Sequence, residues 1–190
     1  MANRKAVEAL ESPHEWRPNL SLITDDLAVG GSFPRGRAGD LANRLRIGAI
    51  VDLRVEACDD PVEIARHGIA FLHLPTDDHC AVTPAMLDEG VAFATRHIDS
   101  GRRVLVHCEH GIGRSATLAL AVLVARGLAP LDALELAKTR RSLVSPSPAQ
   151  YEAWAAWLAL WKDRYPDGWA IPDFDAFKAI AYRHLLHASG

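Results

Sequence analysis

The chain of 190 residues lacks three features that would each have fixed its class. It has 3 cysteines, too few for a disulfide framework. It has no apolar run close to the roughly 20 residues that span a bilayer, and its N-terminus lacks the apolar core of a secretion signal. We therefore expect a protein of the reducing cytoplasm that does not insert into a membrane.

A strong excess of charge of one sign is also missing. The net charge of −3 argues against general binding to nucleic acid or to membrane surfaces. Any attraction for an anionic ligand must then be local. The pairs Arg102-Arg103 and Arg140-Arg141 are candidates, although such pairs usually lie on a solvated surface. The 49% hydrophobic content is enough for one ordinary core. The sequence does not determine the oligomeric state.

What the sequence does contain is a cysteine placed between a strand and a helix. The apolar run Val104–Val106 leads into His107 and Cys108, Arg114 follows after five intervening residues, and residues 116–125 have a helical pattern. A sulfur at a helix N-terminus among backbone amides is stabilised as a thiolate, because both favour the anion. The segment therefore predicts a thiolate nucleophile inside an oxyanion cradle.

The residues of this loop fit that interpretation individually. Gly111 and Gly113 permit backbone conformations closed to residues with a Cβ, so that successive N–H groups can point to one spot. Arg114 adds a planar fork that matches two phosphoryl oxygens, and Ser115 can donate to the sulfur when it leaves. An inert core cysteine is the alternative for Cys108, but it leaves the glycines and the arginine unexplained. The predicted phosphate-binding residues are Glu109, His110, Gly111, Ile112, Gly113 and Arg114.

The string from His107 to Ser115, His-Cys-Glu-His-Gly-Ile-Gly-Arg-Ser, resembles the signature of the cysteine-dependent protein tyrosine phosphatases, and in particular their compact dual-specificity branch. The resemblance extends from Leu20 to about Leu158 and implies a cysteinyl-phosphate intermediate on Cys108, with no cofactor. The loop is also similar to those of cell-cycle and lipid phosphatases, so it does not separate these groups. The Trp-Pro-Asp tripeptide of the larger tyrosine-specific enzymes is absent, which favours the compact type.

The resemblance also implies a general acid on a mobile loop upstream of the cysteine, which protonates the leaving group and later activates water. Asp77 and Asp78 follow Pro75 at the end of an apolar segment. The family's pattern, with the acid three residues after a proline, selects Asp78 as the catalytic acid over Asp77. The alternative is that both are carboxylates that solvate a turn.

Two supporting residues are predicted in the same way. Some branches of the family use a glutamine in a later loop to orient the hydrolytic water, and Gln150 has a comparable placement. The family's usual proline after the arginine is Ser142 here, and Gln150 could equally be a solvated first-turn residue. His107 is expected to hydrogen-bond nearby backbone and to hold the loop in shape.

The other candidates for chemistry are less specific. Four histidines near the two loops could suggest a metal, but their spacing matches no closed tetrahedral site, so we expect none. They are His73, His79, His107 and His110. Cys58 or Cys80 could capture an oxidised Cys108 as a disulfide, although incidental cysteines are the alternative. Arg54 and Glu56 could brace the site through a salt bridge.

Strands and helices alternate along the chain, which predicts an α/β fold with a central mostly parallel sheet flanked by helices. We predict a lead-in over residues 1–19 with a short helix at 4–10, a single catalytic domain over 20–162 and a C-terminal helical appendage over 163–190. The C-terminal third has helical patterns at 131–140 and 148–161. A stripe in the second of these is expected to be core rather than a ligand site. It consists of Trp154, Trp157, Leu158 and Trp161.

The function expected from the resemblance is a phosphatase acting on phosphotyrosine and on phosphoserine or phosphothreonine of proteins. Glu109 and His110 stand where some lipid-directed enzymes carry lysines, which favours a phosphoprotein. A phosphoinositide or another small phosphate ester is the alternative substrate. A rhodanese-like sulfurtransferase or arsenate reductase fits the loop less well, and a non-catalytic phosphate-binding module would normally have lost Cys108 or Arg114.

Overall fold

The computed structural model describes residues 16–162 and 168–183. Its centre is a five-stranded sheet in the order β1-β2-β5-β3-β4. β1 runs antiparallel to β2, and the other neighbours are parallel, which confirms the predicted mostly parallel α/β sheet. The strands are β1 (Leu20–Leu22), β2 (Leu27–Gly30), β3 (Ile47–Arg54), β4 (Ala70–Thr76) and β5 (Arg103–His107).

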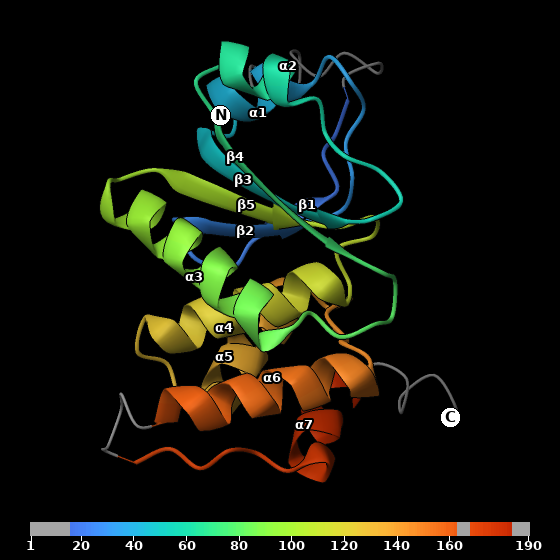
Figure 1. The fold of residues 1–190 in the computed structure, drawn as a ribbon, viewed down its shortest axis with the longest axis vertical. Coiled ribbons are helices and arrows are strands. Elements are labelled where there is room, and N and C mark those ends of the chain that lie inside the picture. The colour runs from blue at the N-terminus through green and yellow to red at the C-terminus, as the bar shows by residue number, and fades with distance from the viewer. Residues whose placement is uncertain (1–15, 163–167, 184–190) are drawn as a thin grey trace, which may run out of the picture.

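Helices cover both faces of this sheet (Figure 1). α1 (Ala38–Asn43) and α2 (Pro61–Arg66) lie on one face, and α3 (Pro84–Asp99) and α4 (Arg114–Ala125) lie on the other. A further layer follows beyond α4. It contains α5 (Pro130–Arg140), α6 (Pro148–Trp161) and α7 (Phe174–Ala181). The predicted helix at 4–10 lies outside the described residues, and the predicted domain boundaries stay predictions.

The alternation of side chains along the strands builds one core on each face of the sheet. In β5, Val104 and Val106 belong to the larger core beneath α3 and α4, while Leu105 belongs to the smaller core beneath α1 and α2. This is the period of two that a strand imposes on its side chains. β5 is therefore fixed by packing on both faces up to His107, the residue that precedes Cys108.

α4 is buried on every side. Residues 114–124 are all buried, because the helix lies between the sheet and the outer helical layer (Figure 1). The helix begins at Arg114, two residues earlier than the predicted start at residue 116. Arg114 and Ser115 are thus part of the first helical turn, which gives their side chains a fixed direction.

The aromatic stripe of α6 packs into the larger core, as predicted. Trp154, Trp157 and Leu158 are at most 1% exposed, while Trp161 is partly buried against the same cluster. The indole N–H groups of Trp157 and Trp161 both donate to Asp88 of α3, at 2.9 and 2.8 Å. None of the helices within the described ranges is long and apolar enough to cross a bilayer.

The C-terminal helix α7 is attached to the segment that precedes α6. Phe177 is fully buried, and the Tyr182 hydroxyl donates to the carbonyl oxygen of Pro146 at 2.6 Å. Lys138 of α5 donates to the carbonyl oxygens of Val144 and Ala181, at 2.7 and 2.6 Å. The end of α7 and the segment 144–146 are therefore held by shared hydrogen bonds.

Replacing Tyr182 by phenylalanine tests how firmly α7 supports that segment. The substitution keeps the ring but leaves the Pro146 carbonyl without this donor, so we expect the free energy of unfolding to fall by about 1 kcal/mol. Urea denaturation followed by tryptophan fluorescence measures the change. An unchanged midpoint would mean that the hydroxyl contributes nothing to the attachment of α7.

Candidate active site

The loop between β5 and α4 forms a cradle around one sulfur atom. Cys108 is 3% exposed. Its Sγ accepts a hydrogen bond from the Gly111 N–H at 3.3 Å and lies 3.3 Å from the Ser115 hydroxyl oxygen. Gly111 has φ +72°, and a Cβ there would lie 2.5 Å from the carbonyl carbon of Gly30. This position therefore requires glycine.

The hydrogen bonds of the cradle favour the thiolate. Burial alone raises the pKa of Cys108, but hydrogen bonds from Ser115, Gly111 and His110 outweigh it, and the pKa lies below its ordinary value. A thiol with a depressed pKa supplies more nucleophile at neutral pH. Backbone amides gathered around the sulfur would also face the oxygens of a bound oxyanion.

Arg114 is oriented by two partners on the far side of its guanidinium. Nη1 donates to Glu56 and to the Thr76 carbonyl oxygen, and Nη2 donates to the other oxygen of Glu56, all at 2.8 Å. This ion pair lowers the pKa of Glu56 to about 2. Glu56 and Arg54, which were expected to brace the site, each form ion pairs, Glu56 with Arg114 and Arg54 with Asp52 and Asp59. The Nε of Arg114 is buried and has no hydrogen-bond partner among the residues that the structure describes.

The unused donors of Arg114 lie together. Of its five N–H groups, three are taken by Glu56 and Thr76, which leaves the Nε–H and one Nη2–H. These two point from the same edge of the planar group and form the fork that binds two oxygens of an oxyanion. The side chain is 1% exposed and interacts electrostatically with Cys108. The Nε–H is thus without a partner among the described residues, while the remaining Nη2–H has the Asp78 carboxylate nearby.

Of the two candidate carboxylates, Asp78 is the one at the pocket. Its Oδ1 lies 3.4 Å from Nη2 of Arg114, and its side chain is half exposed. Asp78 lines a cavity of about 180 Å³ over Cys108, whereas Asp77 is not part of the lining. The full lining is Asp78, His79, Cys108, His110, Ile112, Gly113, Ser145 and Gln150.

Gln150 is buried at the wall of this cavity, so the alternative of a solvated first-turn residue is wrong. Its side-chain oxygen accepts from the Ser147 N–H at 2.9 Å, and its own N–H donates to the Ser147 hydroxyl at 3.3 Å, which is a capping box at the start of α6. A Cβ on Gly113 would lie 2.5 Å from the Gln150 side-chain oxygen. The capping box therefore holds the amide against the cysteine loop.

A buried cluster of charges fixes the base of the loop, and sequence reasoning missed most of it. His107 Nδ1 lies 3.4 Å from the Cys108 carbonyl oxygen, which is the predicted backbone contact, and its Nε2 lies 2.8 Å from Asp59. Arg54 donates to both Asp52 and Asp59, at 2.9 and 2.6 Å. Burial opposes the charge on Asp52, but the Arg54 hydrogen bonds lower its pKa. The signal in the sequence that could have revealed this cluster was Asp52, a carboxylate inside an apolar strand.

Arg141 is buried behind the cysteine loop, so the interpretation of this arginine as solvated surface is wrong. It also does not lie where it would attract an anionic ligand. It is 5% exposed and donates to the carbonyl oxygens of Gly111 and His110, at 2.7 and 2.9 Å, and to the Asn19 side chain at 2.8 Å. These bonds turn the loop carbonyls away from Cys108, so that the amides of the loop can face inward. Arg141 acts behind the loop and not at the entrance.

The histidines do not form the metal site considered above. His73 contacts the Arg54 carbonyl oxygen, His107 contacts Asp59, and no group of three possible ligands within residues 16–162 and 168–183 contains two histidines. Two groups of three contain one histidine each: Asp52 with Cys58 and His73, and Asp52 with Asp59 and His107. Arg54 forms ion pairs with both carboxylates of the second group.

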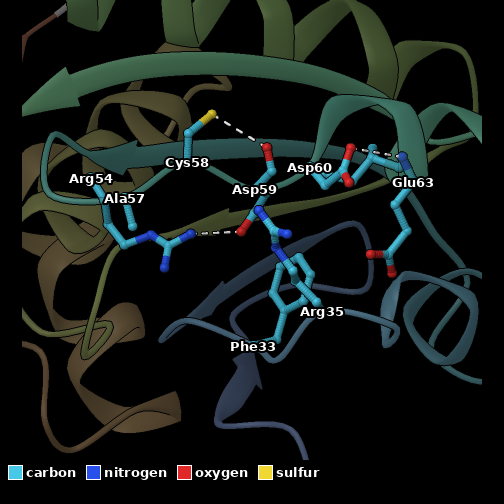
Figure 2. Close-up of a pocket in the computed structure, with 9 residues that line it drawn as sticks. Phe33, Arg35, Arg54, Ala57, Cys58, Asp59, Asp60 and Glu63 are labelled. Carbon is cyan, nitrogen blue, oxygen red and sulfur yellow. Dashed lines mark hydrogen bonds and ion pairs between the residues drawn. The ribbon is translucent and has the colours of Figure 1, made fainter.

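A second cavity, of about 380 Å³, is lined in part by Arg54 and Asp59 of this charge cluster. Figure 2 shows Arg54 paired with Asp59 at its wall, with Phe33 and Arg35 across from them. The exposed Cys58 also lines it and donates to the Asp59 carbonyl oxygen. Capture of an oxidised Cys108 by Cys58 or by the exposed Cys80 stays a prediction.

Comparison with known proteins gives a consistent family. A family model described as "Dual specificity phosphatase, catalytic domain" matches residues 31–160. The chain is 33% identical over 127 residues to dual specificity protein phosphatase 1 of Mus musculus, covering 66% of this chain and 33% of that protein. It is 35% identical over 113 residues to dual specificity protein phosphatase 2 of Mus musculus, covering 58% and 35%. The chain spans about a third of the length of these relatives.

Solved structures share the fold. A crystal structure of PTPMT1 in complex with PI(5)P superposes with a TM-score of 0.70 at 26% identity, covering 75% of this chain and 96% of that one. Human DUSP28 superposes with a TM-score of 0.63 at 24% identity, covering 76% and 97%, and supports the fold alone.

Proposed function

The chain belongs to the dual-specificity phosphatase family, and we propose that it hydrolyses phosphate monoesters on proteins, with phosphotyrosine and phosphoserine or phosphothreonine as substrates. The observation that carries this proposal is the Nε–H of Arg114, a buried donor without a partner among the described residues, on a side chain that interacts electrostatically with the Cys108 sulfur. This Nε–H lies on the same edge of the guanidinium as the Nη2–H near Asp78, and such an edge can bind two oxygens of an oxyanion.

In the first step, the Cys108 thiolate attacks phosphorus, and the bond to the leaving oxygen breaks. Arg114 and the loop amides bind the non-bridging oxygens, where negative charge is held throughout the transfer. Asp78 gives its proton to the leaving oxygen, which departs as an alcohol or phenol. Cys108 is then joined to the phosphoryl group, and Asp78 is a carboxylate.

In the second step, water replaces the sulfur. Asp78 takes a proton from the water, whose oxygen forms the new bond to phosphorus, while Cys108 leaves as a thiolate that accepts a hydrogen bond from Ser115. The side-chain amide of Gln150, held against the loop by its capping box, is positioned to orient this water. The products are inorganic phosphate and the enzyme in its starting state.

A phosphoinositide is the second candidate substrate, because the PTPMT1 structure in complex with PI(5)P is similar to this chain at 26% identity. The acidic Glu109 next to the cysteine argues the other way: it is 42% exposed in its side chain and pairs with Arg54 at 3.6 Å, so this position offers no cation to the additional phosphates of a lipid headgroup. We keep the reducing cytoplasm as a proposal too, because an oxidised thiolate would be inactive.

Turnover by the wild-type protein on matched substrates tests the function. Phosphate release would be measured from a phosphotyrosine peptide, the same peptide with phosphothreonine, and short-chain PI(5)P. We expect the highest kcat/KM on a phosphopeptide. A higher kcat/KM on the lipid would instead identify the phosphoinositide as the substrate. No release from any of these substrates or from an aryl phosphate would overturn the phosphatase assignment and make thiosulfate and arsenate the next substrates to try.

A further inference from the structure

The loop that carries Asp78 is hydrogen-bonded to Ser147, the residue that caps the N-terminus of α6. The Ser147 hydroxyl donates to the carbonyl oxygen of His79 at 2.8 Å. The same hydroxyl oxygen accepts the Gln150 N–H at 3.3 Å. Ser147 therefore uses its donor on the acid loop and its acceptor on the helix, and the two functions of one hydroxyl can be separated by substitution.

The bonded peptide lies directly beside the proposed acid. His79 has φ +59°, a left-handed conformation that is uncommon for a residue with a Cβ. Its N–H donates to Asp78 Oδ1 at 3.1 Å, and the same oxygen lies 3.4 Å from Nη2 of Arg114. The position of the His79 backbone thus sets where the Asp78 carboxylate lies relative to the cysteine loop.

The segment that carries Ser147 is anchored more firmly than the loop that carries Asp78. The Ser145 N–H donates to the Ile112 carbonyl oxygen at 3.0 Å, and the Pro146 carbonyl accepts the Tyr182 hydroxyl at 2.6 Å. By contrast, the side chains of residues 77–80 are exposed. An exposed loop resting on a bonded segment takes its position from that segment.

We propose that Ser147 is a positioning residue for the acid step: its hydroxyl holds the acid loop in the conformation in which Asp78 reaches the leaving oxygen. The proposal rests on the proposed function and names a residue that acts through Asp78, with no contact to the substrate required. Losing one hydrogen bond of this kind shifts the equilibrium between the closed and open positions of the acid loop by about 3- to 10-fold.

Three substitutions separate the hydrogen bond from Ser147 to the His79 carbonyl oxygen, which we call the latch, from the helix cap. Ser147→Ala removes both roles. Ser147→Asp keeps a good N-cap acceptor for the Gln150 N–H, but its carboxylate cannot donate to His79. Ser147→Thr keeps both the donor and the acceptor. If the latch matters, Ser147→Ala and Ser147→Asp are impaired in the acid step and Ser147→Thr is restored to the wild-type rate.

The readout is the rate constant of the first step, measured in a single turnover, and its dependence on the leaving group. Phenyl phosphate leaves as a basic phenoxide and needs the acid, whereas dinitrophenyl phosphate leaves without it. We expect Ser147→Ala and Ser147→Asp to lose about 3- to 10-fold on phenyl phosphate and less than about twofold on dinitrophenyl phosphate. The second substrate also corrects for the added charge in Ser147→Asp, which acts on both substrates.

Asp173→Ala is the matched control, because Asp173 caps α7 by accepting the Ala176 N–H at 2.8 Å. It should lower the melting temperature as Ser147→Ala does, with no change in the ratio of the two rates. Equal losses on both substrates in Ser147→Asp, or a Ser147→Thr variant as slow as Ser147→Ala, would overturn the latch. Failure of the wild type on dinitrophenyl phosphate would instead overturn the proposed function.

Discussion

Replacing Cys108 by serine should reduce phosphate release to the background rate, a loss on the order of 10⁴-fold or more. The serine hydroxyl is not ionised near neutral pH, so the hydrogen bonds that stabilise the Cys108 thiolate would have no anion to act on. The loop amides and Arg114 would remain in place. We therefore expect the variant still to bind a phosphotyrosine peptide, measured by calorimetry, while turnover disappears.

Cys58→Ser provides the matched control, since Cys58 is exposed and its replacement can still donate to the Asp59 carbonyl. It should keep the wild-type rate. In a background where Cys58 and Cys80 are both serine, alkylation by iodoacetamide reports Cys108 alone. Because the pKa of Cys108 is lowered, inactivation should begin at a lower pH than for an ordinary thiol. Phosphate release by a variant that lacks Cys108 would show that the sulfur is not the nucleophile.

Replacing Asp78 by alanine should lower the rate constant of the first step on phenyl phosphate, measured in a single turnover, by about 10²- to 10⁴-fold. The loss has a specific cause, because the leaving phenoxide would depart without a proton. It should be much smaller on dinitrophenyl phosphate, whose leaving group is stable as an anion.

Asp77→Ala is the comparison that the chain itself offers. Asp77 is also exposed and carries the same charge, but it does not line the cavity over Cys108. A large loss in Asp77→Ala with a normal rate in Asp78→Ala would reverse the assignment of the acid. Similar moderate losses in both would indicate that the two carboxylates act through the charge of the loop.

The parts of this site that the sequence predicted are those in which neighbours in space are also neighbours along the chain. Cys108, Gly111, Arg114 and Ser115 lie within one strand-loop-helix segment, so the local pattern was sufficient to predict the cradle. The alternation of strands and helices predicted the sheet for the same reason. The capping box of Ser147 and Gln150 was not predicted, although its two residues lie only three positions apart.

The parts that sequence reasoning missed depend on side chains from distant segments. Asp59 reaches His107 across 48 positions, and Arg141 reaches Asn19 across 122. A charged residue in a polar segment has the same local pattern whether it is solvated or buried against a loop, which is why Arg141 was taken for surface. The choice of Asp78 over Asp77 came from the family's pattern and not from the turn itself, because a turn sequence does not specify the direction of each side chain.

The position of β5 in the sheet has a consequence for how the molecule opens. β5 is the middle strand, paired on both sides, and it continues into the fully buried α4. Its amide protons should exchange with solvent only through global unfolding, whereas those of the exposed residues 77–80 should exchange through local opening. The nucleophile and the acid therefore belong to regions of different local stability. Heat or denaturant would release the Asp78 loop well before it disturbed the sulfur.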